Sequence, residues 1–416
     1  MNCSCIFFNK KMQREDLLKK QLIRLSVFIL LVCPALSQAA PFSVVGPRAL
    51  GMGGASVAAV NDSTAVYWNP AALAHHKKVD IRIPVEAAAQ DHIGLEDKWT
   101  EIKDIYSKVQ AHDPVAINET IRLFQELDRP DTGADLDVSG GLLISFPVSG
   151  SSAVAISGMA LWYAGLFPSI DTLNLSPDPV STNFVGNNES MVTGIGIGTT
   201  QPALSFATSL GESFFIGANV KMIYAETYIT SQTMTSNSFD DFMDDLTDSK
   251  TESSEASIDV GVLFAPVESV RIGIVGRDLN SPSFPVQGRI AQSTGSGVSS
   301  TVATGEIELE PQYRAGVAWQ PYETFTLAAD YDLTRNKTLT PGYESRMAAV
   351  GLEKTFLDEY FNIRLGANRN MEDSSAKTVY TGGLGLRLFA LRLDLAAGYD
   401  FDEKQGAASV NLALRF

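Results

Sequence analysis

The sequence contains few of the side chains on which most catalytic and metal sites depend. Among its 416 residues there are four histidines, and none of them follows residue 112. They are His75, His76, His92 and His112. So few histidines leave little material for histidine-based catalysis or for a metal site with several imidazole ligands. We therefore expect that the protein is not an enzyme and that it holds no metal and no cofactor.

Cysteine is also scarce, and all three cysteines lie within the first 33 residues. Residues 10–24 are rich in Lys and Arg, residues 25–36 are apolar, and small residues follow. This order is typical of a secretory signal peptide, and the apolar run is too short for a confident membrane-spanning helix. We predict that residues 1–39 are cleaved on export, which leaves a chain without cysteine. Both Met1 and Met12 are candidates for the true start.

The charge balance excludes one class of partner. Lys and Arg number 32 against 48 Asp and Glu, which gives a net charge of -16. A nucleic-acid binder usually carries a basic patch, so we expect no nucleic acid partner. Hydrophobic residues make up 45% of the chain, which also argues against wholesale disorder.

Beyond residue 135, apolar residues recur at every second position. In residues 391–395, for example, three leucines alternate with Arg392 and Asp394. This period predicts strands with one apolar and one polar face. Because no helical crossovers separate the strands, we expect an antiparallel, all-β sheet.

The connections decide between a soluble sandwich and a membrane barrel. Short links lie at 149–151, 210–212, 266–267, 320–322, 357–358 and 389–390, and longer ones at 166–191, 229–253, 279–304, 334–343, 369–377 and 401–406. Strict alternation of short and long links is typical of transmembrane barrels, whereas a sandwich has no reason to alternate so regularly. We predict a transmembrane antiparallel β-barrel of about 14 strands, with twelve to sixteen acceptable. The expected strands are 77–89, 136–147, 153–165, 192–208, 213–228, 254–265, 268–278, 305–319, 323–333, 344–355, 359–368, 378–388, 391–400 and 407–416.

The C-terminus supports the same interpretation. Residues 410–416 alternate apolar and polar side chains and end in Phe416. This ending resembles the C-terminal signal of outer-membrane proteins, which the barrel-insertion machinery reads. We therefore expect the outer membrane of a Gram-negative bacterium, with lipid and lipopolysaccharide as surroundings.

The segment before the first strand is too irregular for a strand and too rich in glycine for a stable helix. Its runs Leu50-Gly-Met-Gly-Gly-Ala-Ser, Asn61-Asp-Ser and Tyr67-Trp-Asn-Pro-Ala resemble the N-terminal hatch of the FadL-like transporter superfamily, and most closely its conjugal-transfer TraF-like branch. The resemblance implies a hatch of residues 40–76 inside the lumen of a barrel of residues 77–416. The hatch residues that it marks are Gly51, Gly53, Gly54, Asn69, Pro70 and Ala71.

The resemblance also implies a ligand pocket near the mature N-terminus, and Phe42 is the candidate there. An equally good alternative is that Phe42 only anchors the hatch. Arginines on the inward faces could bind a carboxylate head group, and we name Arg314, Arg364 and Arg392 as candidates. The favoured alternative is that the lumenal charges pair with one another and hold the hatch.

The first long loop, at about 90–135, breaks the β pattern. Trp99, Ile102, Tyr106 and Val109 have helical spacing, and Asp113-Pro114 is a good start for a second helix. The apolar stripe of this helical pair serves either packing against the loop's own barrel or binding of a hydrophobic ligand or a partner.

Two functions fit this architecture. The first is passive uptake of small hydrophobic compounds, fatty acids or hydrocarbons, through a barrel gated by the hatch. The second is a structural or assembly role in an envelope, secretion or conjugal-transfer system without transport activity.

Overall fold

The structure is a computed structural model that describes residues 37–38, 42–75, 78–91, 94–129, 132–237, 239–294, 297–341, 343–357, 359–373, 376–401 and 405–416. The chain divides into two compact units, Met1–Ser37 and Gln38–Phe416. Almost all of the predicted signal peptide lies outside the described residues, which include only the short strand β1 (Ser37–Gln38) from that region. The architecture below is that of the second unit.

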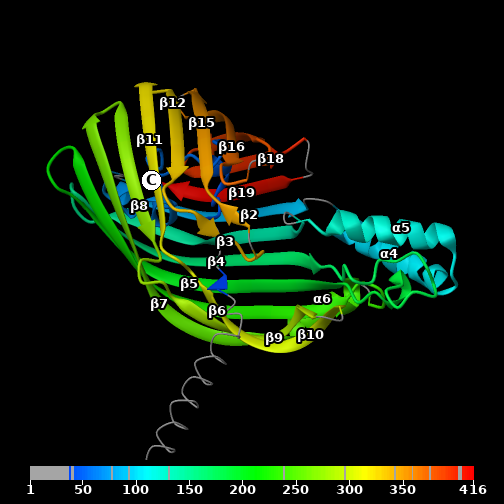
Figure 1. The fold of residues 1–416 in the computed structure, drawn as a ribbon. Helices are drawn as coiled ribbons and strands as arrows, with labels where there is room; N and C mark the ends of the chain where they lie inside the picture. Colours follow the sequence, from blue (N-terminus) through cyan, green and yellow to red (C-terminus); the bar gives the residue numbers. More distant parts are fainter. Residues whose placement is uncertain are drawn as a thin grey trace, which may run out of the picture. The chain divides into compact units, whose positions relative to one another are not determined.

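Within the described residues, fourteen antiparallel strands form a closed barrel (Figure 1), as the sequence predicts. Their bounds are Asp80–Asp91 (β2), Ala134–Pro147 (β3), Ser152–Ser169 (β4), Met191–Ser209 (β5), Phe214–Thr233 (β6), Thr251–Val267 (β7), Val270–Arg277 (β8), Gln312–Tyr322 (β11), Phe325–Asp332 (β12), Met347–Phe356 (β15), Phe361–Asn370 (β16), Val379–Leu388 (β17), Leu391–Tyr399 (β18) and Gly406–Arg415 (β19). The last strand, β19, pairs with the first, β2, so the sheet closes on itself. Phe416 and Val79 add two backbone hydrogen bonds of 3.0 and 3.1 Å at this junction, and the Phe416 side chain is exposed. Its role in membrane insertion stays a prediction.

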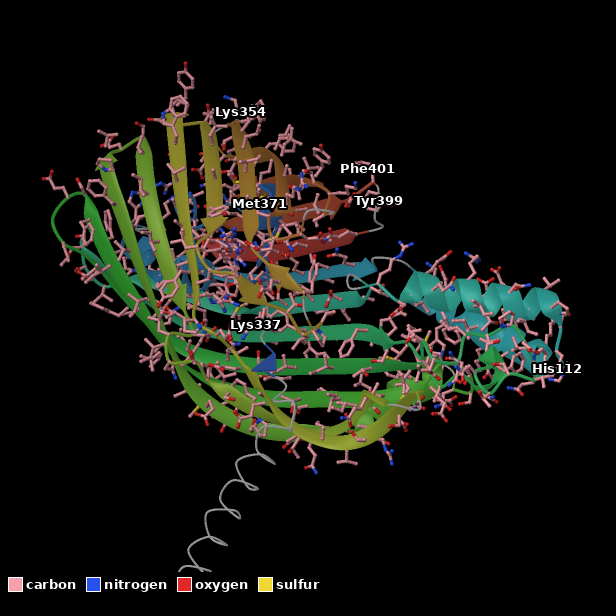
Figure 2. All side chains as sticks on the ribbon, viewed as in Figure 1. His112, Lys337, Lys354, Met371, Tyr399 and Phe401 are labelled. Carbon is pink, nitrogen blue, oxygen red and sulfur yellow. The ribbon has the colours of Figure 1, made fainter. Side chains whose placement is uncertain are left out.

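The apolar faces of the strands point outward. In β18, Leu391, Leu393 and Leu395 are 38% to 49% exposed, whereas Asp394 between them is 5% exposed and faces the interior. Tyr399 continues the outward row at the end of the strand (Figure 2). Aliphatic side chains exposed in such a row need a lipid environment, so the fold is that of a transmembrane barrel.

One predicted strand has the wrong bounds. The sequence predicts a single strand at 305–319, but β10 (Gly297–Glu308) ends before Pro311, which has no N–H to donate, and β11 begins after it. β10 pairs with β9 (Ser283–Thr294) in a long hairpin instead of joining the barrel. This hairpin packs on the inner face of β6, where the Thr227 Oγ1 donates a hydrogen bond of 2.6 Å to the carbonyl oxygen of Pro285. Ile307 is therefore buried and does not face lipid.

The first long loop is helical, as predicted. It forms α4 (Leu95–Gln110) and α5 (Pro114–Leu127), which lie side by side beyond the end of β2 (Figure 1). Asp113 caps α5, because its Oδ1 accepts hydrogen bonds from the backbone N–H groups of Val115 (2.8 Å) and Ala116 (3.2 Å). The apolar stripe packs against other outer loops, with the Trp99 ring 5.4 Å from that of Phe242 in α6 (Phe239–Asp248). Packing thus accounts for the buried part of the stripe. No helix in the described part of the chain is long and apolar enough to cross a membrane.

Candidate functional site

Residues 42–75, most of the predicted hatch, form an almost wholly buried segment on the inner face of the barrel, named here the plug segment. It contains three short helices, α2 (Pro47–Gly51), α3 (Ala65–Trp68) and the 3-10 helix η1 (Pro70–His75). Gly53 and Gly54 follow α2 with φ angles of 69° and 93°, a backbone conformation that side chains disfavour. The glycine-rich sequence therefore makes a tight turn where a longer helix would not fit.

Glycines on the inner face of the wall let the plug segment approach it backbone to backbone. A Cβ atom on Gly366 in β16 would lie 2.2 Å from the backbone nitrogen of Gly53. A Cβ on Gly217 in β6 would lie 2.4 Å from the carbonyl carbon of Pro70. Neither distance is sterically allowed, so these wall positions require glycine for as long as the plug segment is in place.

The Asn-Pro-Ala motif fixes the second half of the plug segment. Asn69 is fully buried, and its Nδ2 donates hydrogen bonds to the carbonyl oxygens of Val57 (3.2 Å) and of Val262 in β7 (3.0 Å). Its Oδ1 accepts from the backbone N–H of Ala71 (3.1 Å), and Pro70 begins η1. One amide thus joins two parts of the plug segment to the wall.

Replacement of Asn69 by alanine should lower the free energy of unfolding by about 1–3 kcal/mol, because it leaves buried backbone groups without their partners. Urea titration of the micelle-reconstituted protein, followed by tryptophan fluorescence, measures this change. The matched control is Asn118→Ala on the exposed face of α5, which should cost under about 0.5 kcal/mol. Equal effects of the two substitutions would contradict the anchoring role of Asn69.

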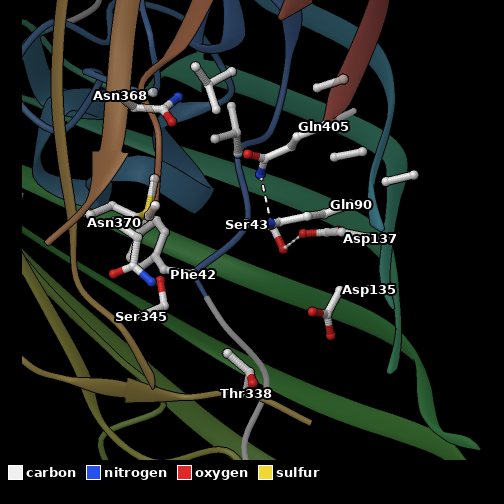
Figure 3. Close-up of a pocket in the computed structure, with 18 of the residues that line it drawn as sticks. Phe42, Ser43, Gln90, Asp135, Asp137, Thr338, Ser345, Asn368, Asn370 and Gln405 are labelled. Atoms are coloured by element: carbon white, nitrogen blue, oxygen red, sulfur yellow. Dashed lines mark hydrogen bonds between the residues drawn. The ribbon is translucent and has the colours of Figure 1, made fainter. Parts of the chain in front are cut away.

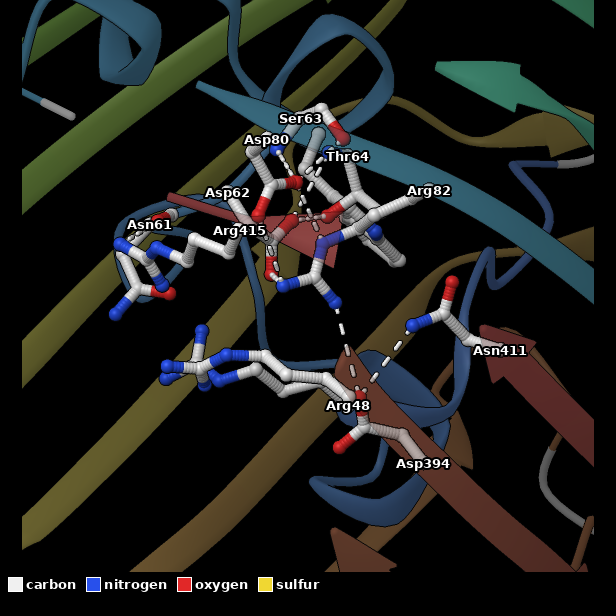
Figure 4. A network of polar contacts seen from close by, with 12 residues as sticks. Arg48, Asn61, Asp62, Ser63, Thr64, Asp80, Arg82, Asp394, Asn411 and Arg415 are labelled. Carbon is white, nitrogen blue, oxygen red and sulfur yellow. Dashed lines mark hydrogen bonds and ion pairs between the residues drawn. The ribbon is translucent and has the colours of Figure 1, made fainter. Parts of the chain in front are cut away.

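A buried network of charges holds the plug segment at the short-turn end of the barrel (Figure 4). Arg82 of β2 lies at its centre, 3.4 Å from Asp62 of the plug segment, 2.8 Å from Asp80 and 3.7 Å from Asp394. Burial alone would raise the pKa of Asp62, but the positive charges of Arg82 and Arg48 and hydrogen bonds from Thr64 outweigh it and hold this pKa below its ordinary value. Asp62 is therefore a buried carboxylate.

A second branch of the network starts from Arg48, also in the plug segment. Arg48 Nη2 lies 2.8 Å from the Glu353 carboxylate in β15, which in turn lies 2.7 Å from Arg364 Nε in β16. Arg364 then reaches Asp394 at 2.8 Å. These contacts favour the alternative that lumenal charges pair with one another and hold the plug segment.

A cavity of about 220 Å³ lies farther along the inner wall, toward the long loops (Figure 3). The plug segment lines it with Phe42, Ser43, Val44, Leu50, Gly53 and Gly54. The strands contribute Glu86, Gln90, Asp137 and Tyr163 among others. An engineered cavity of about 150 Å³ can hold benzene, so this space suits a molecule with a single ring.

The connection between β12 and β15 crosses the interior and borders the cavity opposite the plug segment. Its short strands β13 (Asn336–Lys337) and β14 (Glu344–Ser345) pair with each other, and Leu339 between them is buried. Thr340 Oγ1 donates a hydrogen bond of 3.1 Å to Asp135 in β3. The sequence predicts an outer loop here, and the structure shows that this loop folds inward.

Phe42 lines the cavity and is also firmly packed. Its ring centroid lies 5.6 Å from those of both Tyr67 and Trp68, and the Arg314 guanidinium carbon lies 4.0 Å from it. The position of Phe42 thus agrees with both of its predicted roles, as part of a ligand pocket and as an anchor. Residues 39–41, just before it, lie outside the described residues.

Of the three arginine candidates, one lines the cavity and two do not. Arg314 lines the cavity, although its Nε pairs with Asp332. Arg364 and Arg392 do not line it, and each is held by a carboxylate: Arg364 belongs to the plug network, and Arg392 Nη2 lies 2.6 Å from Glu359 in a short turn. Of the three, only Arg314 therefore remains a candidate for contact with a ligand in the cavity.

Sequence reasoning missed the acidic side of the cavity. Glu86 of β2 and Asp137 of β3 face inward side by side, since Glu86 opposes Ser139 and Asp137 opposes Ala88 in the strand register. The signal was present, because Glu86 interrupts an apolar run at an inward position. Only the register shows that the two carboxyls share one cavity.

The described histidines pack on aromatic rings. His75 lies 5.4 Å from Phe215, and His112 lies 5.6 Å from Phe184. His76 and His92 lie outside the described residues. In the described ranges, no group of three or more His, Cys, Asp or Glu side chains is arranged to hold a metal ion.

The family model described as "F plasmid transfer operon, TraF, protein" matches residues 66–332. The chain belongs to this family. This agrees with the predicted TraF-like branch. No curated protein matches the chain.

Solved structures show the same fold at low sequence identity. The toluene transporter TbuX of Ralstonia pickettii is 13% identical, with a TM-score of 0.55 over 89% of this chain and 98% of that one. The monoaromatic hydrocarbon channel CymD is 12% identical, with a TM-score of 0.55 over 91% of this chain and 99% of that one. A FadL homologue of Pseudomonas aeruginosa is 12% identical, with a TM-score of 0.52 and the same coverage. These neighbours are transporters and channels, and the fold is that of FadL-type barrels.

Proposed function

We propose that this barrel takes up small hydrophobic compounds passively across the outer membrane of a Gram-negative bacterium and that the plug segment gates the path. The observation that carries the proposal is the cavity of about 220 Å³ between the plug segment and the inward-folded loop. A barrel filled for purely structural reasons has no need of such a space. The structures with a similar fold include a toluene transporter and a monoaromatic hydrocarbon channel, which supports the proposal.

The cavity volume favours a single ring over a long acyl chain. Drug-sized ligands fill pockets of roughly 300–1,000 Å³, which is more than this cavity offers. We therefore propose a monoaromatic compound of the size of toluene in place of a long-chain fatty acid.

The plug segment is too well anchored to leave the barrel at each passage. Separating Asp62 from Arg82 or Glu353 from Arg48 would leave buried charges unpaired, at a cost of several kcal/mol each. Among the described residues no ion pair holds the stretch 42–45, which is held by the hydrogen bonds of Tyr67 and Trp68 to its carbonyl oxygens, by that of Ser43 to Asp137 and by the ring contacts of Phe42. A local movement of this stretch, with Phe42 leaving the cavity wall, is the cheaper way to open the path.

The experiment that tests the proposal fills the cavity. Ala88→Trp places an indole on the cavity side of β2 and should abolish toluene binding in isothermal titration calorimetry of the detergent-solubilised protein. Ala87→Trp is the matched control, because it adds the same side chain to the exposed outer face of the same strand and should leave binding unchanged. Equal toluene binding by both variants, or failure of the wild-type protein to bind any small monoaromatic probe, would refute the proposal.

A structural or assembly role is the second candidate function. The family description, which names a plasmid transfer operon, and the helical pair α4–α5 beyond the strand ends favour it. If the role is purely structural, Ala88→Trp should complement a deletion strain as well as the wild-type gene does. If the role is uptake, the same variant should fail wherever the transported compound is required.

A further inference from the structure

The acidic side of the cavity bears on the chemistry of the ligand. Glu86 is only 4% exposed and lines the cavity, and its Oε2 has no hydrogen-bond partner in the described part of the molecule. Asp137 lines the same cavity from the neighbouring strand and accepts a hydrogen bond from the Ser43 Oγ of the plug segment. A buried carboxylate oxygen without a donor is costly, and unsatisfied groups of this kind often mark a site.

No basic side chain of the described chain neutralises this pair. The basic residues that line the cavity are Arg314, Arg369 and Lys377, which lie on β11, on β16 and before β17. In the closed barrel, strands β17, β18 and β19 separate β16 from β2. Neither Glu86 nor Asp137 forms an ion pair with any described residue, whereas Arg314 is already paired with Asp332. The cavity therefore has an acidic side for which the described chain supplies no basic partner.

We propose that the ligand of this cavity is a small, mainly apolar molecule with a protonated amine, which points at Glu86 and Asp137. This inference rests on the proposed uptake function and narrows its substrate class. An ammonium group donates up to three hydrogen bonds and compensates buried negative charge, which a hydrocarbon cannot do. A carboxylate would meet like charge on this side and is disfavoured.

The surroundings of the two carboxyls suit an amine with an aromatic body. Phe42, Tyr163 and Leu339 line the same cavity and supply apolar surface for a ring. Gln405 Nε2 donates a hydrogen bond of 2.9 Å to Gln90 Oε1 next to them, so these two amides satisfy each other in part. Glu86 Oε2 is a buried oxygen beside the cavity without a hydrogen-bond partner among the described residues.

The test compares three probes of one size in isothermal titration calorimetry at pH 7.5: benzylamine, toluene and benzoate. The full protein in nonionic detergent should bind benzylamine at least about tenfold more tightly than toluene. This ratio of Kd values corresponds to the usual free energy of one hydrogen bond to a charged group. Benzoate should bind more weakly than toluene. Glu86→Gln should bring the Kd of benzylamine up to that of toluene and leave toluene binding little changed, and Asp137→Asn should act in the same direction.

Glu268→Gln is the matched control. Glu268 is exposed in the short turn between β7 and β8, so this substitution removes one carboxyl group far from the cavity. It should preserve the preference for benzylamine, which separates a site from general attraction of cations to an acidic protein. Toluene binding without a preference for benzylamine, or a preference that survives Glu86→Gln, would overturn the inference and leave the uptake function standing. Failure of all three probes to bind would refute the uptake function itself.

Discussion

Substitution of valine for Gly366 is expected to push the plug segment off the wall and to turn a closed barrel into a conducting one. The new Cβ would lie 2.2 Å from the Gly53 nitrogen, and both partners are backbone, so no side chain can rotate out of the way. Overpacking of this kind costs about 1–3 kcal/mol, and displacement of the first half of the plug segment relieves it. Conductance of single barrels in planar lipid bilayers should rise several-fold over the wild-type protein.

The control for this substitution is Gly158→Val on the outer face of β4, where no atom lies within 4 Å of the added Cβ. Valine is favoured in strands, so both substitutions suit the local backbone and differ only in what the new side chain meets. Gly158→Val should leave conductance at the wild-type level. If Gly366→Val stays closed with unchanged thermal stability, the plug segment is not held against the wall as described.

The barrel could be predicted from the sequence because its physical cause is local. Lipid on one side and a polar interior on the other impose a period of two on every strand, and the alternation in residues 391–395 shows it directly. The order of strands then follows from chain order, since each strand pairs with the next. The same period is misleading at residues 305–319, because β10 does not belong to the barrel wall: it pairs with β9, and β9 packs on the inside of β6.

The site was less predictable, because its parts come from distant segments. Phe42 and Arg314 were identified as candidates, and the structure places both on the cavity. Arg364 and Arg392 carried the same signal, but their partners Glu353 and Glu359 can be assigned only from the folded geometry. Glycines at strand positions that point into the barrel are a signal that can be read from the sequence. Gly217 and Gly366 are examples, and they mark where the plug segment touches the wall.

The second large effect is expected from Arg82→Met, which removes the centre of the charged network. Asp62 and Asp80 would keep their places in the interior without their nearest counter-charge, since the Arg82 side chain is only 6% exposed. Breaking a buried ion pair in this way costs about 3–5 kcal/mol. Urea unfolding in detergent micelles, read by the heat-modifiable shift in gel mobility and by fluorescence, should show the loss.

The pH dependence distinguishes this electrostatic cause from simple loss of packing. In the wild-type protein the pKa of Asp62 is lowered, so its ion pair stabilises the fold at neutral pH and this contribution fades only as the pH falls below the ordinary value of 3.8. Without Arg82 the largest cause that lowers the Asp62 pKa is lost and burial is opposed by Arg48 and Thr64 alone, so we expect the folded variant to take up a proton before the unfolded chain does. The loss of unfolding free energy in Arg82→Met should therefore shrink as the pH falls from 7 toward 4, and Asp62→Asn in the same chain should recover part of this loss at pH 7.

Arg392→Met is the control. Because its partner Glu359 is 53% exposed, this substitution should lower the free energy of unfolding by less than about 1 kcal/mol. A deficit that stays constant with pH would mean that Arg82 holds the plug segment through its packing and not through its charge.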